Sequence, residues 1–284
     1  MTTKVTITGT GTPIQTPDRA GPGVLVNSGE IVLQFDAGRG TVMRLAAADS
    51  NLADLDALFV THHHSDHIVG IPDLLMTRWL NDVQRRGQAP LPIYTPEGEA
   101  SRMIAGMLDV WLHEMEMRQG HTGRPNIAES DVHPFETSKD QITSVAQFEE
   151  VAISAIAVEH KPVAPAVAYR IDTPDGSVVI SGDTAVCPQV EKLSVGVDLL
   201  VHEAIRAEGL KGLVSDPERL LAYHAECTPL GAMAERAGVK HLVLTHLVPP
   251  PTTPNDKEAF ATDIRTGGFT GEIVVADDLL IVDL

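Results

Sequence analysis

The 284-residue sequence has little of several features that common classes of protein require. Its two cysteines, Cys187 and Cys227, are too few for a disulfide framework or a four-cysteine zinc site, and they are typical of a reducing compartment. No apolar run approaches the roughly 18 residues that a membrane-spanning helix needs, and residues 1–9 lack the basic and apolar pattern of a leader. We therefore expect a cytoplasmic protein with no membrane partner.

Basic residues are also scarce. Lys and Arg number 21 against 39 Asp and Glu, which gives a formal net charge of −18. A chain of this charge repels polyanions at long range, so the composition disfavours nucleic acid as a partner. The hydrophobic content of 43% is that of an ordinary globular protein with a sizeable core.

Short strand-forming runs alternate with helical patterns, which predicts layers of sheet and helix. We expect helices over residues 41–48 and 68–80, and over Pro229–Ala237 with Thr228 as the N-cap. Residues 81–139 differ, because a partly helical, amphipathic segment there is followed by a polar loop. Its apolar side chains either cover the core or, like Met107 and Trp111, line a substrate pocket.

The strongest chemical signal is a run of histidines after an apolar, strand-forming segment. Four of the twelve histidines fall within six positions, in the run Thr61-His62-His63-His64-Ser65-Asp66-His67. Alternate side chains of an extended segment point the same way, so His62 and His64 converge and His63 points away. Asp66 and His67 follow a turn and face a second point nearby. The spacing predicts two metal half-sites.

Two half-sites require further ligands, and the sequence supplies candidates. His160, Asp183 and His246 each come just after the carboxyl end of a strand-forming run. Loops at the ends of strands are where α/β proteins assemble their sites. Together with the first motif, these residues complete a dinuclear metal site.

The pattern His-x-His-x-Asp-His, followed by isolated His, Asp and His, resembles that of the metallo-β-lactamase superfamily. Within it, the chain most resembles the ribonuclease Z and arylsulfatase-like branch. The stretches that carry the resemblance are Gly9–Pro13, Phe35–Thr41, Ser181–Thr184 and His202–Ala204. The resemblance covers about residues 5–250. It implies an α/β fold, a four-layer αββα sandwich of two mixed sheets with helices outside, forming one domain over residues 1–284 and a homodimer.

The resemblance also implies a role for each motif residue. The seven metal ligands would be His62, His64 and His160 for one ion, Asp66, His67 and His246 for the other, and Asp183 between them. Asp36 would orient a ligand imidazole, and Glu203 would orient His224 as the proton donor to the leaving group. The expected catalytic residues are thus Asp66, Glu203 and His224. Two divalent ions are expected, zinc by preference, with manganese or iron as alternatives for such ligands.

We expect a metal-dependent hydrolase of a small ester-like substrate, with a phosphodiester or sulfate ester favoured and a metal-activated hydroxide as nucleophile. Ribonuclease Z members that process tRNA carry a long arm, for which Lys161–Gly182 leaves no room. Arg39 also stands where that family usually has an acidic residue. With the acidic charge, these departures disfavour tRNA 3′ processing and favour a small-molecule substrate.

Other functions remain as alternatives. The same metal core serves lactone and carboxylic ester hydrolysis, although that branch is not expected to retain Glu203 together with His224. A redox di-iron protein of this fold normally has a carboxylate where this chain has His64. A non-catalytic scaffold is disfavoured because the whole ligand set is present.

Overall fold

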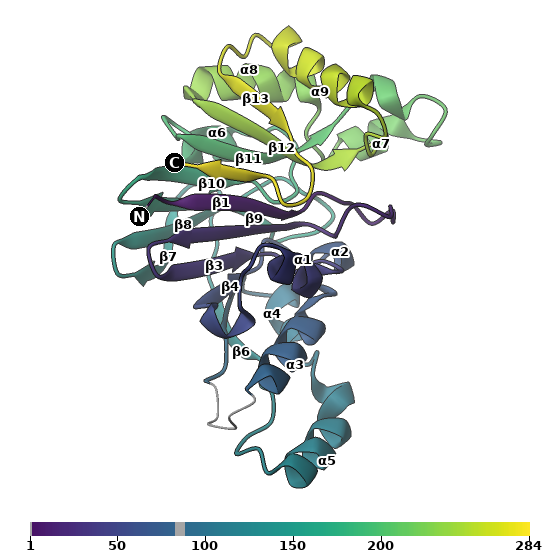
Figure 1. Ribbon diagram of the computed structural model, residues 1–284. Coiled ribbons are helices and arrows are strands. Elements are labelled where there is room, and N and C mark those ends of the chain that lie inside the picture. Colours follow the sequence, from purple (N-terminus) through teal and green to yellow (C-terminus); the bar gives the residue numbers. More distant parts are fainter. Residues whose placement is uncertain (1, 83–88) are drawn as a thin grey trace.

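Strands rich in Val, Ile and Leu form two seven-stranded sheets in the computed structural model, which describes residues 2–82 and 89–284 (Figure 1). The first sheet has the order β14-β1-β2-β3-β4-β5-β6. Its strands are β1 Lys4–Gly9, β2 Gly23–Ser28, β3 Ile31–Phe35, β4 Ala57–Phe59, β5 Pro92–Pro96, β6 Asp131–Phe135 and β14 Ile281–Asp283. Strands β1, β2 and β3 are antiparallel, whereas β3 to β6 are parallel, so the sheet is mixed.

The second sheet has the order β13-β12-β11-β10-β9-β8-β7 and is also mixed. Its strands are β7 Thr143–Phe148, β8 Val151–Ala157, β9 Val167–Thr173, β10 Gly176–Ile180, β11 Leu199–Ile205, β12 His241–Val248 and β13 Glu272–Val275. Strands β10 to β13 run parallel. The interior strand β11 is buried at every position, as expected of a parallel strand covered on both faces.

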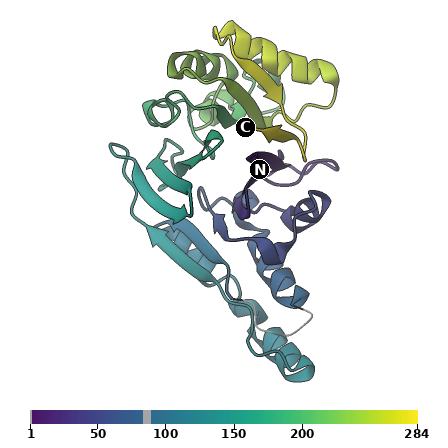
Figure 2. The ribbon, with the colours of Figure 1, turned by 60° about the vertical axis from the view of Figure 1, so that its left-hand side comes forward.

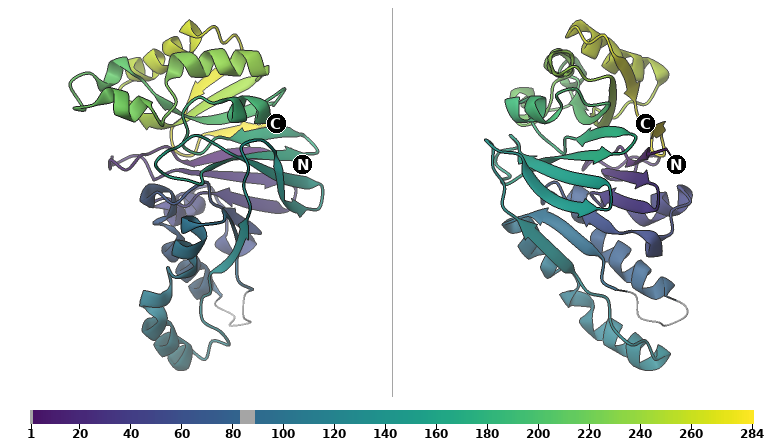
Figure 3. Two further views of the ribbon diagram at one scale, coloured as in Figure 1. Left: turned by 180° about the vertical axis from the view of Figure 1, so that it is seen from behind. Right: turned by 90° about the vertical axis from the view of Figure 1, so that its left-hand side faces the viewer.

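Helices cover the outer face of each sheet. The helices are α1 Thr41–Ala47, α2 Ser65–Ile68, α3 Ile71–Asn81, α4 Glu99–Ala105, α5 Leu112–Thr122, α6 Pro188–Leu193, α7 Pro217–Leu221, α8 Cys227–Ala237 and α9 Pro254–Thr266, with 3₁₀ turns η1 Leu52–Asp54, η2 Asp109–Trp111 and η3 Glu208–Leu210. Those of the N-terminal half and those of the C-terminal half lie at opposite ends of the molecule, with the strands between them (Figure 3). None of the described helices is long and apolar enough to cross a membrane.

Three hydrophobic clusters explain this layering. One fills the space between the sheets, with Phe35 and Phe59 of the first sheet against Tyr169 of the second. A second joins α6, α8 and α9 to the second sheet, and a third joins α1, α3, α4 and α5 to the first. Burying one Leu, Ile or Phe side chain contributes about 1.5–3 kcal/mol, so these clusters hold the layers together. The expected four-layer αββα sandwich with two mixed sheets is confirmed.

Segment boundaries differ from the sequence expectation in two places. The predicted helix over residues 68–80 corresponds to α3, which begins at Ile71, while Ile68 ends the separate helix α2. Helix α8 begins at Cys227, with Glu226 as its N-cap instead of Thr228. The segment of residues 81–139 is partly helical, and it also contributes β5 and β6 to the first sheet. Residues 83–88 of that segment lie outside the described residues. Its helix α5 lies at the end of the molecule farthest from α8 and α9 (Figures 1 and 2).

Glycines allow two backbone segments to touch beneath the histidine motif. A Cβ atom on Gly38 would lie 2.3 Å from the carbonyl oxygen of Asp66, and one on Gly70 would lie 2.2 Å from the carbonyl oxygen of Gly38. Only a residue without a side chain fits at this distance. The Ala37 amide consequently reaches the His67 carbonyl at 2.8 Å, which docks the end of β3 against α2.

We predict that Gly38→Ala destabilises the protein by about 1–3 kcal/mol, because the added methyl group has no space among backbone atoms. Thermal unfolding measures the effect. Gly120→Ala is the matched control, since a Cβ atom there meets nothing within 4 Å. Gly120 lies in α5, so alanine should be neutral or stabilise by up to about 1 kcal/mol. Equal melting temperatures for the two variants would contradict the close-contact argument.

Candidate metal centre

The seven side chains that the sequence singles out as ligands lie together at one edge of the sandwich. They come from both sheets: His62 and His64 after β4, Asp66 and His67 in α2, His160 after β8, Asp183 after β10, and His246 in β12. All are buried except His64, which is half-buried. Strand ends from both sheets therefore meet at this one place, and the packing of the sheets against each other positions the side chains.

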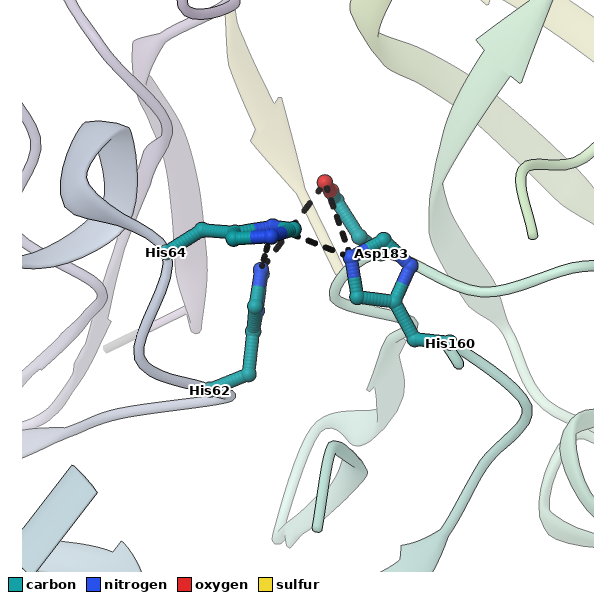
Figure 4. Close-up of side chains that lie close together, drawn as sticks. All are labelled: His62, His64, His160 and Asp183. Carbon is teal, nitrogen blue, oxygen red and sulfur yellow. Dashed lines mark hydrogen bonds and ion pairs between the residues drawn. The ribbon is translucent and has the colours of Figure 1, made fainter. Parts of the chain in front are cut away.

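Three imidazole nitrogens and one carboxylate form the first group (Figure 4). Nδ1 of His64 lies 3.0 Å from Nε2 of His62 and 3.1 Å from Nε2 of His160. Oδ2 of Asp183 lies 4.0 Å from the His62 nitrogen and 3.9 Å from the His160 nitrogen. Ligands bound tetrahedrally at 2.0–2.1 Å are about 3.3 Å apart, so these spacings suit four atoms around one cation.

The outer hydrogen bonds of this group leave lone pairs facing its centre. The Thr61 hydroxyl donates to Asp36 Oδ2 at 2.8 Å, so it accepts from Nδ1–H of His62 at 3.0 Å. Nδ1–H of His160 donates to the Tyr223 carbonyl oxygen at 2.9 Å. A neutral imidazole has one N–H, so Nε2 of each ring is an unprotonated ligand atom.

Asp66, His67 and His246 form the second group. Nε2 of His246 lies 3.4 Å from Oδ2 of Asp66 and 3.4 Å from Oδ2 of Asp183. Nε2 of His67 lies 3.3 Å from Oδ1 of Asp183, is buried, and has no hydrogen-bond partner. Asp183 thus faces both groups, one oxygen toward His67 and the other toward the remaining imidazoles.

Asp36 orients two parts of the centre at once. Its Oδ2 accepts from Nδ1–H of His67 at 2.7 Å, and its Oδ1 accepts from the Thr61 amide at 2.8 Å. The first bond directs Nε2 of His67 into the second group, and the second bond holds the start of the loop that carries His62. This is the arrangement that ligand imidazoles usually require.

The electrostatics of the centre favour a cation. Burial alone would raise the pKa of Asp183, but the imidazoles of His246 and His67 hold it well below its usual range. Burial likewise raises the pKa of Asp66, but the hydrogen bond from His246 and the charges of His67 and His246 together lower it below its usual value. Burial lowers the pKa of His67, yet the carboxylates of Asp183 and Asp36 bring it well above its usual value. These ionised carboxylates therefore attract positive charge.

The three imidazoles of the first group are neutral. Burial lowers the pKa of His62 well below its usual value, with the neighbouring His67 adding to the effect. Burial and His160 lower the pKa of His64 to about 4, and burial lowers that of His160 itself. Neutral imidazoles are the form that binds metals. The residues present therefore fit divalent metal ions that accept nitrogen and oxygen ligands.

Glu203 and His224 lie beside the two groups. Nδ1 of His224 is 2.8 Å and 2.9 Å from the two carboxylate oxygens of Glu203, whose side chain is fully buried in β11. Burial would lower the pKa of His224, but Glu203 raises it to about 9. The His224 ring stacks on that of His246 at 5.7 Å and lies 5.2 Å from that of His160. A protonated imidazole thus lies next to one histidine of each group.

The remaining candidates lie elsewhere. His63 is half-buried and belongs to neither group. Met107 packs against the outer core of the first sheet, whereas Trp111 is 47% exposed and lines a groove of about 500 Å³ between α3 and α5. Arg39 donates to the carbonyl oxygens of Thr12 and Ile14, so it ties down that loop. None of the residues that line the groove is a ligand candidate, and the pocket role of Met107 and Trp111 stays a prediction.

Sequence reasoning missed two contributors and the backbone conformation of a third residue. Thr61 adjoins the histidine motif, and its hydroxyl is the one feature of the sequence that could have indicated a hydrogen bond to a ligand. Tyr223 acts through its backbone carbonyl, which no residue type announces. His246 is in a β-bulge, since Glu203 pairs with Thr245 and Ala204 with Leu247, and it has a φ of 43°. Left-handed backbone at a histidine cannot be read from spacing.

Comparison with known proteins assigns the family. The family described as Beta-lactamase superfamily domain matches residues 24–247. Ribonuclease Z of Mycobacterium bovis is 35% identical over 286 residues, which cover 99% of this chain and 98% of the relative. The chain belongs to the metallo-β-lactamase superfamily, in its ribonuclease Z branch. Family membership makes it a metal-dependent hydrolase. The arylsulfatase-like character and the homodimer stay predictions.

Solved structures share the fold of this metallo-β-lactamase superfamily member. The metallo-β-lactamase fold protein YhfI of Bacillus subtilis superposes with a TM-score of 0.74 at 21% identity and covers all of both chains. The short form of human tRNase Z superposes with a TM-score of 0.66 at 23% identity and covers 98% of both chains. At these identities the likeness concerns the fold alone.

The expected partner was wrong. The sequence favours a small molecule over nucleic acid, yet relatives aligned along almost the whole chain are named ribonuclease Z. The charge of −18 is a sum over all residues and does not give the local field at a site where cations would offset Asp66 and Asp183. The relative from M. bovis aligns over 98% of its own length, so a missing long arm does not separate this chain from it.

We predict that His64→Ala weakens zinc binding and that His63→Ala does not. His64 lies between two other nitrogens of the first group, whereas its neighbour belongs to neither group. Losing a ligand should cost more than the roughly 10–100-fold in affinity that losing an outer hydrogen-bond partner costs. Titration against a chromophoric chelator measures both variants. Similar affinities in the two variants would remove His64 from the ligand set.

Proposed function

We propose that this protein is an RNA phosphodiesterase of the ribonuclease Z type that uses two divalent ions, zinc by preference. The observation that carries the proposal is the convergence of two ligand groups on Asp183, with the Glu203–His224 pair beside them. Its likeness to enzymes named ribonuclease Z extends along almost the whole chain and supports RNA as the substrate class.

The residues divide the work of holding the ions. His62, His64 and His160 would hold one ion, Asp66, His67 and His246 the other, and Asp183 would contact both. Bound divalent ions supply Lewis acidity, which makes hydroxide available at neutral pH and offsets charge on the phosphoryl oxygens. The neutral imidazoles of the first group and the ionised carboxylates of Asp66 and Asp183 are already in the protonation states that such ions require.

His224 supplies the proton for the leaving oxygen. Its pKa of about 9 keeps the ring protonated at neutral pH, and Nδ1–H is engaged by Glu203, so Nε2–H is the proton available for transfer. A positioned general acid contributes about 10²–10⁴-fold to a rate. When a ribose oxygen leaves, protonation avoids release of an alkoxide. Glu203 then stabilises the protonated ring and fixes its orientation.

The direct test is cleavage of a precursor tRNA with a 3′ trailer by zinc-loaded protein. We expect a single cut near the end of the mature tRNA sequence. Asp66→Ala should abolish it because that carboxylate belongs to the second group. The control Asp54→Ala should cleave normally, because Asp54 is exposed in η1 and belongs to neither ligand group nor the groove beside Trp111. The RNA substrate could remain intact while the same preparation hydrolyses a small aryl phosphodiester. That result would contradict RNA as the substrate class but would still support phosphodiester hydrolysis.

A second prediction concerns pH. Glu203→Gln removes the charge that raises the pKa of His224 from its usual value to about 9. The acid is lost as pH rises through that pKa, so the alkaline fall in kcat should move to lower pH, by about one unit or more. The pH profile of kcat between pH 6 and pH 10 measures it. Glu208→Gln, at an exposed glutamate paired with Lys211, should leave the profile unchanged. An unmoved alkaline limb in Glu203→Gln would contradict the role of His224.

A further inference from the structure

A buried carboxylate in the loop between β13 and β14 collects hydrogen bonds from distant segments. The side chain of Asp278 is 4% exposed. Its Oδ1 accepts from the amide and the hydroxyl of Thr10, at 2.9 Å and 2.7 Å. Its Oδ2 accepts from the Ala20 amide at 2.6 Å and from Nε of Arg44 at 2.8 Å. Asp278 thus closes the loop between residues 10 and 20 and fixes its position against α1.

Thr10 passes this restraint on to β12. Thr10 is completely buried, and its carbonyl oxygen accepts from the Leu247 amide at 3.3 Å. The carbonyl oxygen of Gly9 accepts from the Thr245 hydroxyl at 3.4 Å. Because β1 belongs to the first sheet and β12 to the second, these bonds join the sheets on either side of His246.

Arg19 completes the arrangement around the Thr10 hydroxyl. Its Nη1 donates to that oxygen at 2.6 Å and to the Ala276 carbonyl oxygen at 3.1 Å. The hydroxyl therefore accepts from Arg19 and gives its own proton to Asp278. With both its amide and its hydroxyl engaged, Thr10 has a fixed orientation, and so does the carbonyl that holds Leu247.

His246 depends on such support more than the other histidines of the centre. It is the unpaired residue of the β12 bulge and has a φ of 43°, a conformation that a histidine keeps only when its surroundings impose it. If β12 relaxed to a regular strand, the side chains beyond the bulge would change faces. The His246 imidazole would then leave Asp66 and Asp183.

We propose that Asp278 is a positioning residue that, through Thr10, holds the His246 bulge in the shape that binds the second metal ion. This proposal rests on the two-ion centre proposed above. It assigns to the last loop of the chain a role at a site to which that loop contributes no ligand. The ion held by His62, His64 and His160 does not depend on this network.

The test is stepwise zinc titration of Asp278→Asn against a chromophoric chelator. The asparagine amide presents N–H groups to one set of donors, so the network breaks with little change in size. We expect the weaker zinc affinity to fall about tenfold, as for the loss of an outer partner of a ligand, and the tighter one to stay unchanged. A purely structural role would lower the melting temperature of the metal-free protein and alter both affinities alike, or neither.

Asp172→Asn is the matched control. Asp172 undergoes the same chemical change, but its side chain is 50% exposed and pairs with Arg170, which makes no contact with Thr10 or Asp278. Both zinc affinities should be those of the unaltered protein. If Asp278→Asn does not fold, Thr10→Val and Thr10→Ser decide instead. Valine should weaken binding of the second ion selectively, whereas serine, which keeps the hydroxyl, should retain the normal affinity.

Four results would overturn the proposal. The first is that Asp278→Asn binds both zinc ions with the affinities of the unaltered protein, and the second is that it binds both equally more weakly. Neither result contradicts the two-ion centre. For the fallback pair, the overturning result is Thr10→Val and Thr10→Ser behaving alike. Uptake of a single ion by the unaltered protein would remove the two-ion centre and this inference together.

Discussion

The candidate site contains buried carboxylates and unprotonated imidazole nitrogens, which together require positive charge among them. Asp66 and Asp183 are ionised and nearly inaccessible, Nε2 of His67 has no hydrogen-bond partner, and the lone pairs of His62 and His160 face the same volume. Buried carboxylates are stable only when positive charge compensates them, here from the protonated His67 and His224 or from bound cations. The ligand atoms without hydrogen-bond partners, supported by hydrogen bonds on the outer side of the site, favour cations at this place.

The rest of the fold fixes the positions and orientations of the ligand side chains. Ligands come from strand ends of both sheets, so the hydrophobic layer between the sheets sets their separation. Close contact at Gly38 and Gly70 docks the histidine motif against the end of β3, where Asp36 orients His67. On the opposite side, hydrogen bonds from Thr10 and Gly9 join the sheets around His246. Glu203, in the interior strand β11 of the second sheet, keeps His224 protonated and fixes its orientation.

Much of this was accessible from sequence, for identifiable reasons. Ligands that follow strand-forming runs could be expected at one edge, and the structure brings all seven together. The layered fold followed from family resemblance and is confirmed. Backbone features stayed hidden: the Tyr223 carbonyl, the left-handed bulge at His246 and the true start of α8 have no signature in residue type. The partner was misjudged because a net charge contains no information on where charges lie. The missing arm was also taken to exclude RNA, although a relative named ribonuclease Z aligns with this chain over 98% of its own length.

The most direct test of the central claim is an anomalous-scattering measurement at the zinc edge on crystals grown with zinc. The account predicts two peaks at the edge of the sandwich. One should lie about 2.0–2.2 Å from ligand atoms of His62, His64 and His160, the other at the same distance from Asp66, His67 and His246, with Asp183 between them. A single peak, or peaks only on surface histidines such as His113 and His121, would contradict it.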